Sequence, residues 1–178
     1  MSALYTLDAA ASTVTLSTFA EGRLALLAHD LELAARQLSG TASRAPTPRA
    51  ELELLVAGLQ VIGAVKKGKV DAGVLSAGDR SDIERRIRED VFGGARTLTI
   101  VGEVEGSRAR LTVSAPQGKA TFPVESFTLT EEQDGALRVA GECALSLKAL
   151  HLKEVKGPLG AFKVSDRIVV RFRALFSG

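Results

Sequence analysis

Apolar and polar residues alternate with a period of two along much of the chain, most clearly near its C-terminal end. In residues 137–148 (LRVAGECALSLK), every second residue from Leu137 to Leu147 is apolar or small. In residues 167–176 (RIVVRFRALF), apolar residues again take one set of alternate positions, and arginines take most of the other set. Such alternation predicts antiparallel strands that bury one face and expose the other.

Shorter stretches between turn signals predict six further strands. These are residues 13–19, 24–36, 51–58, 97–105, 108–115 and 119–130. Glycine-containing sequences such as EGS at 105–107 and QDG at 133–135 are typical of tight links between consecutive strands. The sequence VKKGKV at 65–70 is interpreted as a loop with solvated lysines, and residues 156–162 as an irregular loop or a single turn.

Residues 76–94 break the alternation and predict one short amphipathic helix, at about residues 79–91. Apolar residues recur there every four positions and form one stripe on a helix. They are Ile83, Ile87 and Val91. Ser81 and Glu84 have the spacing of a capping box, although Asp79 is an alternative cap. The helix is expected either to cover one end of the fold or to gate a cavity or form part of a dimer surface.

Eight strands and one helix, without a repeat or a linker, predict a single mostly β domain over residues 1–178. An eight-stranded antiparallel barrel is favoured over a sandwich because closure removes the exposed strand edges. A barrel of eight strands is just wide enough to be filled by side chains or to hold one small ligand. The chain has seven Phe, one Tyr and no Trp, and this scarcity of aromatic residues hints at a cavity.

Composition and charge exclude several classes of function. The 23 basic and 21 acidic residues nearly cancel, so no electrostatic footprint for nucleic acid is present. A single cysteine, Cys143, rules out an internal disulfide and a multi-cysteine metal site. No secretory signal and no apolar stretch long enough to span a membrane are visible. We expect a soluble, cytoplasmic protein without a cofactor.

His29, one of only two histidines, lies in the apolar stretch LALLAHDLELAARQLSG at 24–40. On a strand it shares a face with three leucines, whereas Asp30 faces the other way, which excludes a catalytic His/Asp pair. The three are Leu27, Leu31 and Leu33. The other histidine, His151, has no partners at metal-ligand spacing, so no metal site is predicted. His29 is interpreted either as a buried, hydrogen-bonded structural residue or as a polar anchor inside a ligand cavity.

Three more polar or reactive residues have structural interpretations. Cys143 lies on the apolar face of its strand and is expected to be a small core residue. Asp30 and Arg36 could pair on the exterior, as a minor stabiliser. Asp166 is expected to cap or position the loop that precedes the last strand.

Three segments, in order, resemble the YceI-like family. AHDLELAARQLSGT (28–41) is similar to the family's strand with His-Asp-Leu, followed by Ser-Gly-Thr. LSAGDRSDIERRIREDVFGGARTLTIVGEV (75–104) is similar to its Asp-Arg-x-x-Ile helix and the strand after it. GPLGAFKVSDRIVVRF (157–172) is similar to its Leu-Leu-Gly-Ala-Leu-Lys-Val ending. The chain resembles a divergent member, because Ala28 and Leu38 stand where Gly and Trp are common.

The resemblance implies a lipocalin-like barrel associated with polyisoprenoid lipids. The expected function is therefore non-enzymatic binding of a long apolar lipid, such as an isoprenoid, a quinone or a fatty-acyl chain. From the alternation, the expected ligand-binding wall is Leu27, His29, Leu31, Leu33, Leu145, Leu147, Ile168, Val170 and Phe172, with Arg171 and Arg173 pointing outward. The alternatives are a filled barrel that serves as a structural or protein-interaction module, and an enzyme with His29 as a lone general base. The assembly state stays open, a homodimer being one option.

Overall fold

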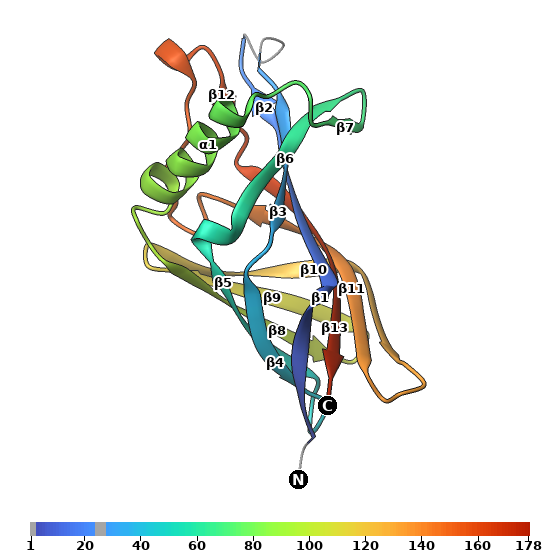
Figure 1. The fold of residues 1–178 in the computed structure, drawn as a ribbon. Coiled ribbons are helices and arrows are strands. Elements are labelled where there is room, and N and C mark those ends of the chain that lie inside the picture. The colour runs from blue at the N-terminus through green and yellow to red at the C-terminus, as the bar shows by residue number, and fades with distance from the viewer. Residues whose placement is uncertain (1–2, 24–27) are drawn as a thin grey trace.

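The computed structural model describes residues 3–23 and 28–178, and strands dominate it (Figure 1). The strands are β1 (Leu4–Thr18), β2 (Ala20–Glu21), β3 (Asp30–Ala35), β4 (Leu38–Ser43), β5 (Arg49–Leu55), β6 (Leu59–Lys66), β7 (Lys69–Asp71), β8 (Thr97–Glu105), β9 (Arg108–Ala115), β10 (Gly118–Glu131), β11 (Leu137–Ser146), β12 (Lys163–Val164) and β13 (Arg167–Ser177). The helical segments are η2 (Val56–Gly58), α1 (Ala77–Arg86), η3 (Ile87–Val91) and η4 (Pro158–Gly160).

Eight of these strands form a closed antiparallel barrel, as the sequence predicted. Around the barrel they follow the order β1, β4, β5, β8, β9, β10, β11 and β13, and the pairing of β13 with β1 closes the ring. This last pairing runs from Thr6 opposite Ser177 to Ser17 opposite Val169. Each strand therefore has a partner on both sides along part of its length, and the barrel has no continuous exposed edge.

At one end of the barrel the sheet continues beyond the ring. The N-terminal part of β1 pairs with β4, whereas Thr15–Thr18 pairs with β3, which in turn pairs with β6 and then β7. The chain crosses between these two levels at Gly58, where a Cβ atom would lie 2.7 Å from the backbone nitrogen of Gln37. The backbone N–H of Arg36 donates to the carbonyl of Gly58 at 2.8 Å and fixes this crossing.

The helix packs beside β6 at this same end (Figure 1). Its N-cap is Ser76, in a capping box with Asp79, so the predicted box of Ser81 and Glu84 is wrong. The chain enters the helix earlier than expected, which places Ser81 and Glu84 inside it. Glu84 instead accepts a hydrogen bond at 2.9 Å from the backbone N–H of Val61, and this contact ties the helix to β6.

Several strands differ from the predicted ones. The N-terminal part of β1, β4 and most of β6 were not predicted, and the strand expected at 24–36 begins at Asp30, with residues 24–27 outside the described part. In β1 a bulge obscures the alternation: the Asp8 carboxylate accepts from the backbone N–H groups of Ala10 and Ala11, and the register with β13 shifts between Asp8 and Thr13. The expected lysine loop at 65–70 is the β6–β7 hairpin.

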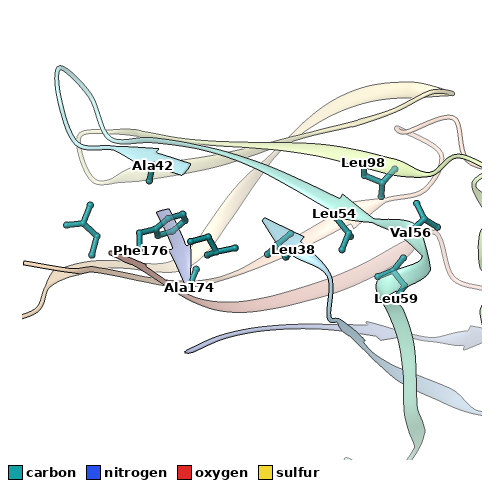
Figure 2. Packing of buried hydrophobic residues seen from close by; sticks show 10 residues of the cluster. Leu38, Ala42, Leu54, Val56, Leu59, Leu98, Ala174 and Phe176 are labelled. Atoms are coloured by element: carbon teal, nitrogen blue, oxygen red, sulfur yellow. The ribbon is translucent and has the colours of Figure 1, made fainter. Parts of the chain in front are cut away.

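The core consists of two clusters of buried apolar side chains on the inner face of the barrel. The first, shown in Figure 2, contains Leu54, Val56 and Phe176 among its most buried members. The second lies beneath the end of the helix and includes Phe122 and Cys143. Cys143 is fully buried, as predicted for a small core residue.

Candidate functional site

The interior of the barrel is not filled. A cavity of about 550 Å³ runs between the strands, and its lining is predominantly aliphatic and aromatic. Cavities of about 300–1,000 Å³ with such linings are typical of small-molecule sites. The filled-barrel alternative predicted no cavity, so the structure speaks against it.

A row of small residues explains part of the open space. Ala42 on β4, Ala50 on β5 and Gly102 on β8 are paired side by side across three adjacent strands. All three line the cavity. Because none has a side chain larger than a methyl group, the wall at this level contributes almost no volume to the interior.

The predicted wall residues in the described part of the chain all line the cavity. They are His29, Leu31, Leu33, Leu145, Leu147, Ile168, Val170 and Phe172. Leu27, the remaining one, lies outside the described residues. The residues of this set within β11 and β13 share the inner face because the alternation of these two strands continues through them. Whether they bind a ligand stays a prediction.

Phe172 reaches across the inner face of β11 at Gly141, its partner in the β11–β13 register. A Cβ atom at Gly141 would lie 3.0 Å from the ring carbon Cζ of Phe172 and 2.6 Å from Cγ1 of Val124. Glycine at this position therefore leaves room for the aromatic ring to lie along the cavity wall.

His29 lies just before β3, and its side chain is exposed while lining the cavity at the helix end. The expectation of a buried, hydrogen-bonded histidine is therefore wrong, because the strand begins only at Asp30. Within residues 3–23 and 28–178 the structure gives His29 no hydrogen bond. Asp30 makes no ion pair with Arg36 there; its Oδ1 accepts from the backbone N–H of Ala20 at 2.8 Å.

Further lining residues were not predicted from the sequence. At the helix end, Ile83 and Ile87 from the helical stripe line the cavity together with Phe162. At the other end, Phe127 and Leu129 line it because a bulge in β10 at Ser126, which has a φ of 50°, reverses the parity after Val124. The stripe was visible in the sequence, whereas the bulge carried no turn signal.

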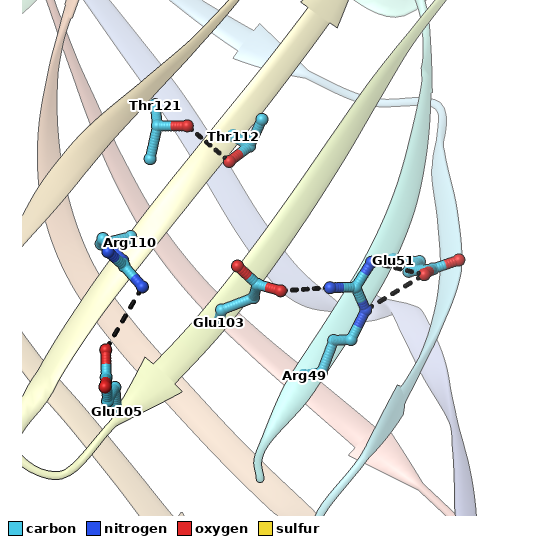
Figure 3. A network of polar contacts seen from close by, with 7 residues as sticks. All are labelled: Arg49, Glu51, Glu103, Glu105, Arg110, Thr112 and Thr121. Carbon is cyan, nitrogen blue, oxygen red and sulfur yellow. Dashed lines mark hydrogen bonds and ion pairs between the residues drawn. The ribbon is translucent and has the colours of Figure 1, made fainter.

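The outer face of the barrel carries chains of polar contacts. Arg171 donates to Glu142 at 2.7 Å and to the hydroxyl of Ser17 at 3.1 Å, and Ser17 donates to Glu32 at 2.7 Å. This chain crosses β11, β13, β1 and β3. Arg171 and Arg173 are exposed, as predicted. On β5, β8 and β9, a second set of contacts includes Arg49 between Glu51 and Glu103 (Figure 3).

Polar contacts also position the loops around the helix end. Asp166 accepts from the hydroxyl of Ser146 at 2.8 Å and from the backbone N–H of Lys148 at 2.7 Å, so it fixes the loop after β11. The Lys148 hydrogen bond is the main cause that holds the pKa of Asp166 below its ordinary value. Lys163 pairs with Glu21 and Glu154, and these contacts raise the pKa of Lys163.

The described residues contain no group of three or more His, Cys, Asp or Glu side chains arranged to hold a metal ion. Within the same ranges, none of the helices has the length and apolar character needed to cross a membrane.

The crystal structure of Burkholderia cenocepacia BcnA has a similar fold, with a TM-score of 0.62 and 16% sequence identity. The alignment covers 95% of this chain and 98% of that chain. The likeness is one of fold. No protein-family model matches the chain, and no curated protein matches it. The barrel predicted from the sequence is thus found in a solved structure of nearly the same extent.

Proposed function

We propose that the protein is a non-enzymatic carrier of a long apolar lipid, such as an isoprenoid, a quinone or a fatty-acyl chain, and a divergent YceI-like protein. The observation that carries the proposal is the apolar cavity of about 550 Å³ inside a closed barrel. The surrounding strands of such a barrel would shield much of a lipid chain from water. The fold shared with BcnA is consistent with this proposal.

The wall is suited to a ligand recognised by its apolar surface. Leu33, Ile168 and Val170 are buried and contribute aliphatic surface from two strands. Each methylene of a ligand transferred from water into such surroundings gains about 0.8 kcal/mol, or about fourfold in affinity. A long chain can therefore bind without any directional polar contact.

We assign no catalytic role to His29. A histidine that acts as a general base needs the correct orientation, which a hydrogen-bonded partner usually supplies. His29 is exposed and has no such partner among the described residues. A polar anchor for a ligand headgroup is open to test: a His29→Ala protein that retains full affinity for lipid would remove the anchor role.

Native mass spectrometry of freshly purified protein, followed by organic extraction, tests the proposal. A discrete adduct that extracts as one lipid class would support a lipid carrier and identify its ligand. A series of fatty acids of increasing length, titrated against a fluorescent fatty acid, provides the second measurement. We expect affinity to rise by about fourfold per methylene and then level off once the chain fills the cavity.

A pair of variants separates the cavity from the outer surface. Ala50→Phe introduces a ring into the row of small residues, and we expect it to shift the plateau of the series to shorter chains. Ala140→Phe on β11 is the matched control, because Ala140 does not line the cavity. Fatty acid affinities that show no dependence on chain length, or an equal effect of the two variants, would contradict binding in the barrel.

A further inference from the structure

Two segments project from the barrel at the helix end, opposite the N- and C-terminal ends (Figure 1). One is the β6–β7 hairpin, with Lys67 and Gly68 in its turn. The other is the loop 156–163, which contains the short helical turn η4. The cavity extends toward this end, since Leu75, Phe162 and Lys156 from the adjoining loops line it.

Each projecting segment exposes a large apolar side chain. Leu159 in loop 156–163 is fully exposed, at 107% of its reference area, and has a left-handed backbone with a φ of 54°. Val70 in the hairpin is 45% exposed. Neither side chain gains anything from this position in an isolated molecule in water. Exposed apolar side chains on two projecting segments are suited to insertion into an apolar medium.

Lysines lie in or beside both projecting segments. Lys66, Lys67 and Lys69 lie in the hairpin, and Lys153, Lys156 and Lys163 lie in or beside the loop. Lys156 and Lys163 pair with Glu154, and Lys163 also pairs with Glu21. The other four have no carboxylate within ion-pair distance in the described part of the chain. The helical residues 77–91 between the two segments carry four arginines and five carboxylates, so the unpaired lysines are concentrated in the hairpin.

The opposite end of the barrel differs in charge. Its arginines are largely neutralised by ion pairs on the surface of the strands and turns. These pairs are Arg44–Glu131, Arg49–Glu103, Arg110–Glu105 and Arg138–Glu132. An exposed leucine also occurs at that end, since Leu4 is 65% exposed, but no comparable group of unpaired lysines surrounds it. Variants at the two ends of the barrel can therefore be compared within the same protein.

We propose that the helix end docks on an anionic lipid bilayer, with the lysines facing the headgroups and Leu159 and Val70 inserting between them. Lysines combined with exposed apolar side chains are the usual composition of segments that bind at membrane interfaces. A bilayer is favoured over an acidic protein because each of the two separate segments combines an exposed apolar side chain with nearby lysines. An acidic protein would account for the lysines but not for the exposed apolar side chains. The inference deepens the proposed function, since docking would bring the helix end of the cavity to the source of its ligand.

Sedimentation with vesicles tests the docking directly. We expect the protein to bind vesicles of phosphatidylcholine and phosphatidylglycerol, and to bind vesicles of phosphatidylcholine alone at least about tenfold more weakly, because several lysines act together. Raising the salt concentration should release the protein, since it screens exposed charges. Equal binding to both vesicles, or no binding to either, would overturn the proposal.

Variants identify the docking surface. The triple variant Lys66→Gln, Lys67→Asn, Lys69→Gln should weaken binding to anionic vesicles by at least about tenfold, because each lysine near the surface contributes severalfold. Leu159→Gln should weaken it further. The matched controls at the opposite end are Leu4→Gln and Arg108→Gln, which should leave vesicle binding unchanged. An equal loss in the controls would show that the helix end is not the docking surface.

Ligand transfer separates failure of this inference from failure of the proposed function. A fluorescent fatty acid bound to the protein should pass to anionic vesicles more slowly in the triple lysine variant, while its affinity for the protein stays unchanged. Fatty acid binding without any preference for anionic vesicles would leave the carrier and remove the docking. Vesicle binding without fatty acid binding would leave the docking and remove the carrier.

Discussion

The thiol of Cys143 lies on the inner face of β11 and is fully buried among apolar side chains. Burial, with a smaller contribution from the Glu125 carboxylate, raises its pKa to about 11. Because the thiolate is the reactive form, a thiol reagent should modify the folded protein at least about 100-fold more slowly than the unfolded protein at neutral pH. Labelling with and without urea measures this ratio. Similar rates in both states would show that Cys143 is accessible in the folded barrel.

Gly141 is the position where a single methyl group should matter most. A Cβ atom there would lie 2.6 Å from Cγ1 of Val124, so we expect Gly141→Ala to lower the free energy of unfolding by about 1–3 kcal/mol. Gly102→Ala is the control, because its Cβ atom would lie 3.4 Å from the nearest neighbour, an ordinary contact. Urea denaturation compares the two. A larger loss of unfolding free energy in Gly102→Ala than in Gly141→Ala would contradict the packing of Phe172 over Gly141.

At the scale of elements, Asp166 links β11 to the start of β13. Its pKa is lowered in the folded protein, so its ionised form contributes stability above its ordinary pKa, near 4, and this contribution is lost as the pH falls through the folded value. We expect Asp166→Asn to lower the free energy of unfolding at pH 7 by about 1 kcal/mol. A hydrogen bond to a charged carboxylate is stronger than one to a neutral amide, and the variant loses only this difference. In acid, once the pH is below the lowered pKa that Asp166 has in the folded protein, the variant and the parent should converge.

Urea denaturation at both pH values measures the effect of Asp166→Asn. A deficit of the same size at acid and neutral pH would mean that the carboxylate charge plays no part in holding the loop after β11.

Strands with uninterrupted alternation could be predicted from the sequence, whereas strands that contain a bulge could be predicted only in part. In β11 and β13 the alternation continues without interruption, so both the strands and the inward residues were predictable. In β1 and β10 a bulge shifts the parity, at Asp8–Thr13 and near Ser126, and the inner face changes from one alternate set to the other. A bulge is decided by contacts with partner strands, which no local pattern records.

The start of the helix also depends on a tertiary contact that the sequence does not show. Its apolar stripe predicted its existence but left its role open, and in the structure Ile83 and Ile87 line the cavity. Its start was misplaced, since two Ser-x-x-acidic sequences close together, at 76–79 and 81–84, both have the spacing of a capping box. Ser76 is the N-cap, because the Glu84 carboxylate accepts a hydrogen bond from the backbone N–H of Val61 in β6 and does not take part in a capping box. Only the tertiary contact distinguishes these two starts.

At the scale of the whole molecule, closure and cavity follow from different properties of the chain. Closure was predicted from the number of strands and the need to cover their edges. The cavity arises from where small residues meet, as in the row Ala42, Ala50 and Gly102, and such a row depends on the register between strands. Composition could indicate that the interior was short of bulky side chains, but it could not locate the space.

The seam of the barrel joins β1 to β13, so Thr6 lies opposite Ser177 and Leu7 opposite Phe176. Contacts between residues so distant in sequence form late and slowly, since a long loop must close first. During synthesis, the ring stays open until β13 is available to pair with β1. A ligand held inside the barrel, as proposed above, would therefore be enclosed only after this last pairing has formed.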